Sequence, residues 1–187
     1  MSNFTVYDSD KILTVKHTIK KNLEEFLLTI QKLGKNCENQ VFVSGGCTAS
    51  LLQGESPKDY DVYFKSKSVA DAVIELYTND PAYTNEVAVY EEKYRDVQVG
   101  QMVITENAVT LKNQLQLIRL HYGTPEEIRK TFDFVHCLPY YDPQDEKFYI
   151  SREQYDCCVN KTLKVNNYSH LTTWREDKFK KKGYKYE

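Results

Sequence analysis

The sequence predicts an α/β (α+β) fold, in which a small, mixed and twisted sheet is covered by helices. Three patterns point to this class. Apolar residues recur at the helical period over residues 15–33, two apolar runs at residues 41–43 and 59–64 flank a pair of glycines, and residues 97–103 alternate between apolar and polar. A chain of 187 residues is expected to form one domain, residues 1–187, with a substantial buried core.

The N-terminal part is expected to contain one long amphipathic helix. Residues 1–14 are polar and β-branched, and we expect a short edge strand to begin there. Over residues 15–33 the apolar side chains, among them Leu23 and Phe26, fall on one helical face, and Gly34 follows as a C-cap. This face is expected to pack on the sheet, and we assign no function to it.

The chain is organised around residues 41–64. Residues 41–43 predict a buried strand, Gly45 and Gly46 a turn, residues 48–53 a short helix, and residues 59–64 a second strand. Glycines lack a Cβ atom, so they allow backbone N–H groups to approach an anion closely. This stretch is therefore the predicted site of chemistry.

Two carboxylates, Asp59 and Asp61, are expected on the same face of the second strand. Side chains alternate along a strand, so these two point together while Tyr60, Val62 and Phe64 face the core. Carboxylate oxygens suit Mg²⁺, which commonly takes its remaining ligands from water and substrate phosphates. The alternative is a solvated acidic turn, since Asp-x-Asp occurs often at surfaces.

The middle of the chain is expected to continue the sheet. Residues 65–67 predict a charged turn, and residues 68–77 a helix with Ser66 or Ser68 as N-cap, ended by the Asn79-Asp80-Pro81 breaker. Extended segments are then expected at residues 86–90, 97–105 and 107–111, with a charged hairpin loop at residues 91–96, and an apolar run that contains Arg119 follows at residues 115–120.

The last part of the chain carries strong helix-start signals. Thr124 followed by Pro125 and Glu127 predicts a capping box and a short helix that ends near Phe132. We expect a buried strand at residues 133–138, a turn at 140–143, a helix from about 152 to 164 capped by Ser151, and a helix at 171–182. In that last helix, Trp174 and Phe179 are expected to face inward.

The central stretch resembles the signature of the DNA polymerase β-type nucleotidyltransferase superfamily, an apolar strand ending in Gly-Gly or Gly-Ser, about ten residues, and Asp-x-Asp in a second strand. Gly45, Gly46, Asp59 and Asp61 match it. The Ser that often follows the glycines is Cys47 here, which moves that phosphate contact to Thr48 or Ser50. Over nearly its whole length the chain looks like small stand-alone nucleotidyltransferase-like proteins of bacteriophages. The segments that carry this likeness are residues 107–111, 115–118, 125–128, 132–136, 175–179 and 182–184.

The resemblance implies a nucleotidyltransferase-type catalytic core at about residues 15–140 and a helical C-terminal segment at about residues 151–187. It also implies transfer of a nucleoside monophosphate from an NTP to a hydroxyl, with release of pyrophosphate. Asp59 and Asp61 would hold Mg²⁺ or Mn²⁺, with two ions about 3.5–4 Å apart.

A third acid is expected from a separate strand. Asp133, which opens an apolar run, is the candidate, and Glu106 is in reserve. For Asp133 the alternative is an N-cap or an ion pair to Arg119 or Arg129. His136 is expected to be structural or adjacent to the substrate and not a metal ligand.

The nucleotide is expected to contact the glycine turn and the basic C-terminal segment. The predicted nucleotide-binding residues are Ser44, Gly45, Gly46, Thr48, Ser50, Lys58, Arg175 and Lys178. Cations on a helix can neutralise a triphosphate or an RNA backbone. The alternative for this basic run is a solvated, frayed end.

Composition leaves the acceptor open. The net charge of −2 gives no overall argument for nucleic-acid binding, although a local basic surface would suffice. The acceptor is expected to be an RNA 3′ end such as tRNA, a protein side chain or a small molecule, and the alternative function is a catalytically silent nucleotide- or partner-binding protein.

Five cysteines without C-x-x-C pairs predict reduced thiols. The absence of a leader or a long apolar window predicts a soluble protein with no membrane partner, located in the cytoplasm, or in the host cell cytoplasm if a phage encodes it. The oligomeric state is left open by the sequence.

Overall fold

The computed structural model describes the chain except for residues 1–8, 35, 81–88, 92–95 and 100–101. The helices are α1 (Ser9–Ile30), η1 (Gln31–Leu33), η2 (Cys37–Gln40), α2 (Gly46–Leu52), α3 (Lys67–Asn79), α5 (Pro125–Arg129), η3 (Val135–Cys137), α6 (Arg152–Val159), η4 (Tyr168–His170) and α7 (Thr173–Lys181). The strands are β1 (Val41–Ser44), β2 (Tyr60–Phe64), β3 (Val89–Glu91), β4 (Asp96–Val99), β5 (Met102–Ile104), β6 (Ala108–Thr110), β7 (Leu115–Tyr122), β8 (Tyr140–Asp142), β9 (Lys147–Tyr149), β10 (Thr162–Leu163) and β11 (Lys185–Tyr186).

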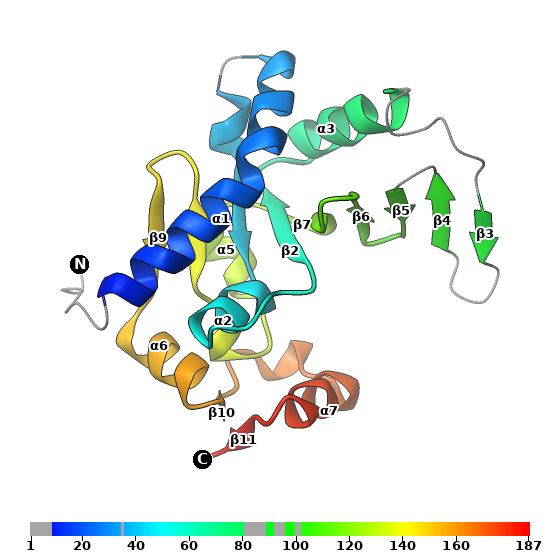
Figure 1. The fold of residues 1–187 in the computed structure, drawn as a ribbon. Helices are drawn as coiled ribbons and strands as arrows, with labels where there is room; N and C mark the ends of the chain where they lie inside the picture. Colours follow the sequence, from blue (N-terminus) through cyan, green and yellow to red (C-terminus); the bar gives the residue numbers. More distant parts are fainter. Residues whose placement is uncertain (1–8, 35, 81–88, 92–95, 100–101) are drawn as a thin grey trace.

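One mixed sheet runs through the molecule (Figure 1). Within the described residues its strand order is β3-β4-β5-β6-β7-β2-β1-β8-β9, and β10 pairs with β11 in a separate two-stranded sheet. In the large sheet β2 and β7 are parallel, whereas the other neighbouring strands are antiparallel. The predicted α/β class with a mixed sheet is confirmed.

The main core lies between the sheet and the helices α1, α2 and α3. Leu23 and Phe26 of α1 are fully buried in it, as are Val62 and Phe64 of β2. The amphipathic pattern of the first helix therefore predicted its buried face correctly. The helix is longer than expected, however, because residues 9–14, where we expected an edge strand to begin, are already part of α1.

The opposite face of the sheet carries a smaller aromatic cluster. Phe42 of β1 stacks on Tyr63 of β2 with ring centroids 5.4 Å apart, and Ile128 of α5 and Tyr140 of β8 complete the cluster. Because both faces of the central strands are covered, β1 is buried at every position.

The predicted caps were largely correct. Ser66 accepts a hydrogen bond from the N–H of Val69 at the start of α3, and Gly34 follows the helix formed by α1 and η1. Thr124 and Ser151 both form capping boxes. Two helices are shorter than expected, since α5 ends at Arg129 and α6 at Val159. The chain beyond α6 also includes two short strands, β10 and β11, that were not expected.

The strand predicted over residues 97–105 is wrong as a single element. It forms two antiparallel strands, β4 and β5, in which Val99 pairs with Met102. Two residues separate Val99 from its partner Met102, which is a spacing typical of a hairpin, and the alternating pattern does not reveal it. The hairpin expected before it is observed, with Glu91 of β3 paired to Asp96 of β4, and residues 86–88 lie outside the described residues.

The strand predicted at residues 133–138 is also wrong. Phe134 forms an isolated bridge with Val165, and the chain then turns through η3, where the N–H of Leu138 donates to the carbonyl of Val135. A short apolar run does not distinguish a strand from a buried turn. The strand begins later, at β8, in residues that we had expected to form a turn.

Candidate active site

The acid pair lies at the start of β2. Asp61 is opposite Ser44 of β1, and Asp59 comes directly before the strand. Tyr60 and Val62 are buried in the main core, so Asp61 points to the other face, where it is partly exposed. Burial and the nearby charge of Asp59 together raise the pKa of Asp61 to about 6. The two carboxylates therefore repel each other in the absence of a cation.

The glycine pair has two different structural roles. Gly45 has a φ of +94°, and a Cβ atom on it would lie 2.9 Å from Oδ2 of Asp61. At Gly46 a Cβ atom would meet nothing within 4 Å. Gly45 is therefore required by the backbone and by the adjacent carboxylate, whereas Gly46 leaves open space beside the acids.

Several hydroxyls predicted to bind phosphate already have partners within the protein. Oγ of Ser44 donates to the carbonyls of Cys137 and Pro139, at 3.2 and 2.9 Å. Oγ1 of Thr48 donates to the carbonyl of Gly45 at 2.8 Å. Both side chains are fully buried. They hold the glycine turn against the segment that contains η3.

The remaining candidates near the turn are less enclosed. Ser50 lies half-buried on α2, and Lys58 is exposed in the loop before Asp59. The thiol of Cys47 is buried in the main core, where it donates to the carbonyl of Ser44, and burial raises its pKa well above the ordinary value. A neutral thiol in this orientation is a packing group.

Asp133 is engaged by the C-terminal helix. Its Oδ2 accepts from Nε of Arg175 at 2.6 Å and its Oδ1 from the terminal guanidinium nitrogen at 3.1 Å. Oδ1 also accepts from the N–H of Phe134. The side chain of Asp133 is 5% exposed and that of Arg175 is 29% exposed, so the bidentate pair joins a buried carboxylate to a partly exposed guanidinium. An ion pair was the alternative for Asp133, but the partner is Arg175 and not Arg119 or Arg129.

The same arginine lies near the acid pair. Although its own burial opposes protonation, the hydrogen bonds and charge of Asp133 raise the pKa of Arg175 above its ordinary value. The positive charges of Lys178 and Arg175 oppose the rise in the pKa of Asp61. Two cations that come more than a hundred residues later in the chain therefore act on Asp61, at the centre of the sheet.

Lys178 is in a crowded positive environment. Partial burial lowers its pKa, and the charges of Arg175 and Lys182 lower it further. Its ammonium group lies 5.3 Å from the ring centroid of Trp174. A concentration of positive charge of this kind favours binding of an anion.

The described residues contain no group of three acidic, histidine or cysteine side chains that is close enough to hold a metal ion. The expected convergence of Asp133 on the acid pair is therefore not observed, and its role as a ligand stays a prediction. Glu106, the reserve, is exposed in the turn between β5 and β6. That turn lies beside Arg119, three residues along β7 from Gln116, the residue that pairs with Asp61. Asp59 and Asp61 alone suit a magnesium ion completed by water and phosphate oxygens.

Two residues near the site were not predicted. Tyr63 shares the face of Asp61. Burial raises the pKa of the Tyr63 hydroxyl, and the negative charge of Asp61 raises it further. Because residues two apart on a strand lie on the same face, the position of Tyr63 two residues after Asp61 could have predicted this. The other is Trp174, which we expected to face inward and which is 66% exposed.

His136, expected to be structural or adjacent to the substrate, is fully buried in an aromatic cluster with Phe134, Phe179 and Tyr184. Neither ring nitrogen has a hydrogen-bond partner. Burial lowers its pKa to about 3. The neutral ring projects from η3 onto Phe179 of α7, and so attaches the helix that carries Arg175.

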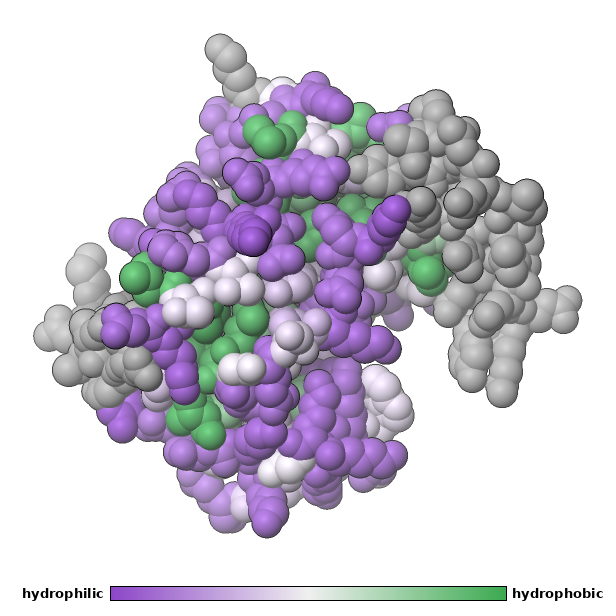
Figure 2. Space-filling model, in the orientation of Figure 1, coloured by the Kyte–Doolittle hydropathy of each residue, from purple (hydrophilic) through white to green (hydrophobic). Residues whose placement is uncertain are grey.

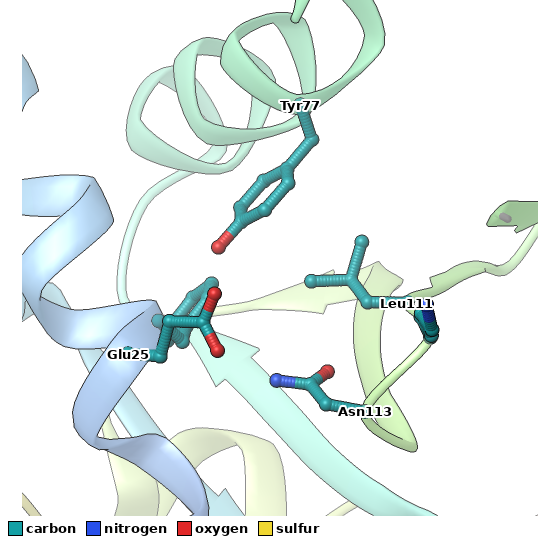
Figure 3. Close-up of a pocket in the computed structure, with 6 residues that line it drawn as sticks. Glu25, Tyr77, Leu111 and Asn113 are labelled. Atoms are coloured by element: carbon teal, nitrogen blue, oxygen red, sulfur yellow. The ribbon is translucent and has the colours of Figure 1, made fainter. Parts of the chain in front are cut away.

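A small cavity lies on the other side of the sheet, between α1, α3 and the turn after β6. Figure 3 shows Glu25, Tyr77 and Asn113 pointing into it. Its volume is about 90 Å³. Ligand pockets typically measure ~300–1,000 Å³, so this cavity is too small for a nucleotide, and it is not lined by either acid.

None of the described helices is long and apolar enough to cross a membrane.

Comparisons with known proteins give a family and a fold. The profile of a family described as "Gad2: Gabija anti-defense 2 family protein" matches residues 17–160. A protein named "Gabija anti-defense 2" from Bacillus phage SPbetaL7 is 25% identical over 132 residues, which cover 69% of this chain and 29% of that protein.

Among solved structures, the Thermotoga maritima CCA-adding enzyme complexed with tRNA matches with a TM-score of 0.55 and 18% identity, over 89% of this chain and 39% of the enzyme. The Bacillus stearothermophilus CCA-adding enzyme in complex with CTP gives a TM-score of 0.49 and 15% identity, over 86% and 37%. The first match confirms the polymerase β-type nucleotidyltransferase fold expected from the sequence. The chain spans under a third of the phage relative and about two-fifths of these enzymes.

Proposed function

This chain belongs to the Gad2 family of Gabija anti-defense 2 proteins, and we propose that its nucleotidyltransferase fold binds a nucleoside triphosphate at the acid pair and transfers the nucleoside monophosphate to a hydroxyl. Pyrophosphate is the leaving group. The observation that carries this proposal is that the positive charges of Arg175 and Lys178 act on Asp61, which lies with Asp59 at the start of β2. Carboxylates suit a metal ion, and the cations suit phosphates.

We propose that Asp59 and Asp61 hold Mg²⁺ or Mn²⁺. The raised pKa of Asp61 supports this, because a cation would relieve the repulsion between two crowded carboxylates. When bound, the metal would supply charge that polarises the phosphate attacked by the hydroxyl. The open space beside Gly46 leaves room for an anion to approach the turn.

The triphosphate is proposed to lie between the glycine turn and α7. Lys178 keeps much of its surface in solvent and can turn from Trp174 towards a phosphate, whereas Arg175 is held in place by Asp133. A guanidinium fixed in this way presents its charge without loss of side-chain entropy on binding. The role assigned to Asp133 in this proposal is to position Arg175.

A second candidate function is nucleotide binding without transfer. It is favoured by one observation, which is that both oxygens of Asp133, the expected third acid, are bound by Arg175. In that case the protein binds and sequesters a nucleotide, and no acceptor takes part.

One experiment tests both candidates. The protein is incubated with each α-labelled NTP, Mg²⁺ or Mn²⁺, and total tRNA, protein or small-molecule acceptors. Transfer predicts label on one acceptor class and release of pyrophosphate, both lost in Asp59→Asn and Asp61→Asn. Asp71→Asn, which removes an exposed ion pair with Lys67, is the matched control and should retain activity. Bound nucleotide that stays unreacted supports the second candidate.

The family name suggests a biological role for the proposed activity. We propose that this site serves an anti-defense role, as the name of the phage relative states for that protein. Cells carrying the Gabija defence would be challenged with a phage while they express either the wild-type chain or Asp61→Asn. Wild type should restore plaque formation and the variant should not. Equal restoration by both would separate the anti-defense role from the acid pair.

A further inference from the structure

The exposed tryptophan on α7 has no role in packing that helix. Phe179, 3% exposed, and Tyr184, 4% exposed, bury the helix and its following segment against Phe134 and His136. Trp174, in contrast, is 66% exposed. A large aromatic ring left in water beside charged residues calls for an explanation other than the core.

Helical spacing divides α7 into two faces. Arg175 and Phe179 are four residues apart on the face that docks, where the guanidinium lies 4.9 Å from the Phe179 ring centroid. Trp174 and Lys178 are four residues apart on the neighbouring outer face, where the ammonium group lies 5.3 Å from the indole centroid. The outer face thus carries an aromatic ring and a cation side by side.

This outer face is connected to the acid pair. A Cβ atom on Gly45 would lie 2.9 Å from Oδ2 of Asp61, Gly45 donates its N–H to the carbonyl of Cys137, and Cys137 shares a buried cluster with Phe179 of α7. These contacts place α7 beside the glycine turn and Asp61, and the charge of Lys178 acts on Asp61 accordingly. Figures 1 and 2 show that the part of the surface where α7 lies is mostly hydrophilic. An aromatic ring beside a phosphate-binding cation, on a polar surface, is an arrangement that can hold a nucleotide by its base and its phosphates together.

We propose that Trp174 stacks on the nucleobase of the nucleoside triphosphate bound at the acid pair, with Lys178 directed to its phosphates. This inference rests on the proposed function, because it assumes that the triphosphate binds beside Asp61. Stacking uses the π-face that every base has, so Trp174 supplies affinity for nucleotides in general and discriminates weakly among them.

The test uses the fact that Trp174 is the only tryptophan of the chain. Its fluorescence is followed in Mg²⁺ buffer during titration with ATP, with CTP and with inorganic tripolyphosphate, which has phosphates and no base. The affinities of wild type, Trp174→Leu and Trp174→Phe are then measured by calorimetry. Tyr168→Leu is the matched control, because Tyr168 is 79% exposed and has no position in the proposed site. Melting temperatures confirm that each variant is folded.

The proposal expects ATP and CTP to quench the fluorescence and tripolyphosphate to leave it nearly unchanged. Trp174→Leu should bind ATP roughly 5- to 150-fold more weakly, the range that aromatic stacking gives, with tripolyphosphate affinity unchanged. Trp174→Phe should recover part of the loss, and Tyr168→Leu should behave as wild type.

Two results overturn the inference while the phosphate site stands. One is equal ATP binding by wild type and Trp174→Leu, and the other is an equal loss of ATP and tripolyphosphate, which would mean that Trp174 acts only by placing Lys178. Absence of binding by every probe would overturn the proposed function together with this inference.

Discussion

Replacing Asp61 by Asn should make the metal-free protein more stable at neutral pH. Asp61 is held beside Asp59 in a partly buried position, and its pKa is raised from 3.8 to about 6 by burial first and by that neighbour second. The folded state therefore binds the proton of Asp61 more tightly than the unfolded state does. A neutral amide of nearly the same shape removes the charge that is unfavourable there.

The expected change in the free energy of unfolding follows from the difference in proton binding between the folded and unfolded states. A rise in the pKa of Asp61 from 3.8 to about 6 corresponds to about 3 kcal/mol. Because the folded pKa is the higher one, the penalty is absent below pH 3.8, grows as the pH rises to about 6, and is complete above that value. Asp61 keeps some contact with water, so this figure is an upper limit. For a chain of this size the melting temperature should rise by up to roughly 6–12 °C at pH 8.

The assay is denaturant unfolding of wild type and Asp61→Asn at pH 4, 6 and 8, with EDTA or with 10 mM Mg²⁺. In EDTA the gain from the substitution should increase between pH 4 and pH 8. Mg²⁺ should stabilise wild type more than the variant, because binding to the folded state adds stability only where the ligands remain. Asp71→Asn, on the exposed ion pair with Lys67, should change stability by less than about 1 kcal/mol at every pH.

Two results would refute this reasoning. A variant less stable than wild type at pH 8 in EDTA would mean that Asp61 is stabilised by its cationic neighbours more than it is destabilised by burial. Equal stabilisation of wild type and variant by Mg²⁺ would place the ion away from Asp61.

The other predictions concern the turn, the aromatic cluster and the basic helix. Gly45→Ala should lower the melting temperature, since its φ of +94° disfavours a side chain, whereas Gly46→Ala should fold normally and weaken NTP binding in calorimetry. Burial lowers the pKa of His136 to about 3, whereas the unfolded state takes up the proton below about pH 6.5, so the protein should be about 3 kcal/mol less stable at pH 4.5 than at pH 7. His136→Phe should remove this acid sensitivity in denaturant titrations, and an unchanged pH profile would contradict the prediction. Arg175→Gln should destabilise the protein by about 3 kcal/mol, because it leaves the carboxylate of Asp133 buried and unpaired. Lys178→Gln should keep the stability of wild type, raise the KM for NTP and reduce the salt dependence of that KM.

The sequence contained enough information to predict the centre of the fold. The β1 and β2 strands have apolar runs interrupted by the glycines, and local period and turn chemistry were sufficient to predict both. Asp59 and Asp61 were predicted because strand alternation places residues two apart together. Those predictions depend only on neighbours in the chain.

Long-range contacts were less predictable. Asp133 was considered next to arginines close in sequence, whereas its partner Arg175 comes 42 residues later. Trp174 and Phe179 were both assigned to the inner face, although five residues turn a helix by about 500°, which leaves the two side chains ~140° apart. Only one of them could be buried, and the structure buries Phe179.

The pairing of Asp133 with Arg175 has a consequence for how the family varies. Loss of Arg175 would leave the buried carboxylate of Asp133 without its cation, so a substitution at position 175 should be accompanied by one at position 133 among related sequences. A relative that keeps an acid at position 133 but lacks a basic residue at 175 would have that carboxylate free to join the metal ion that we propose at Asp59 and Asp61. Under this proposal, variation at position 175 would separate members with two acids at the metal site from members with three.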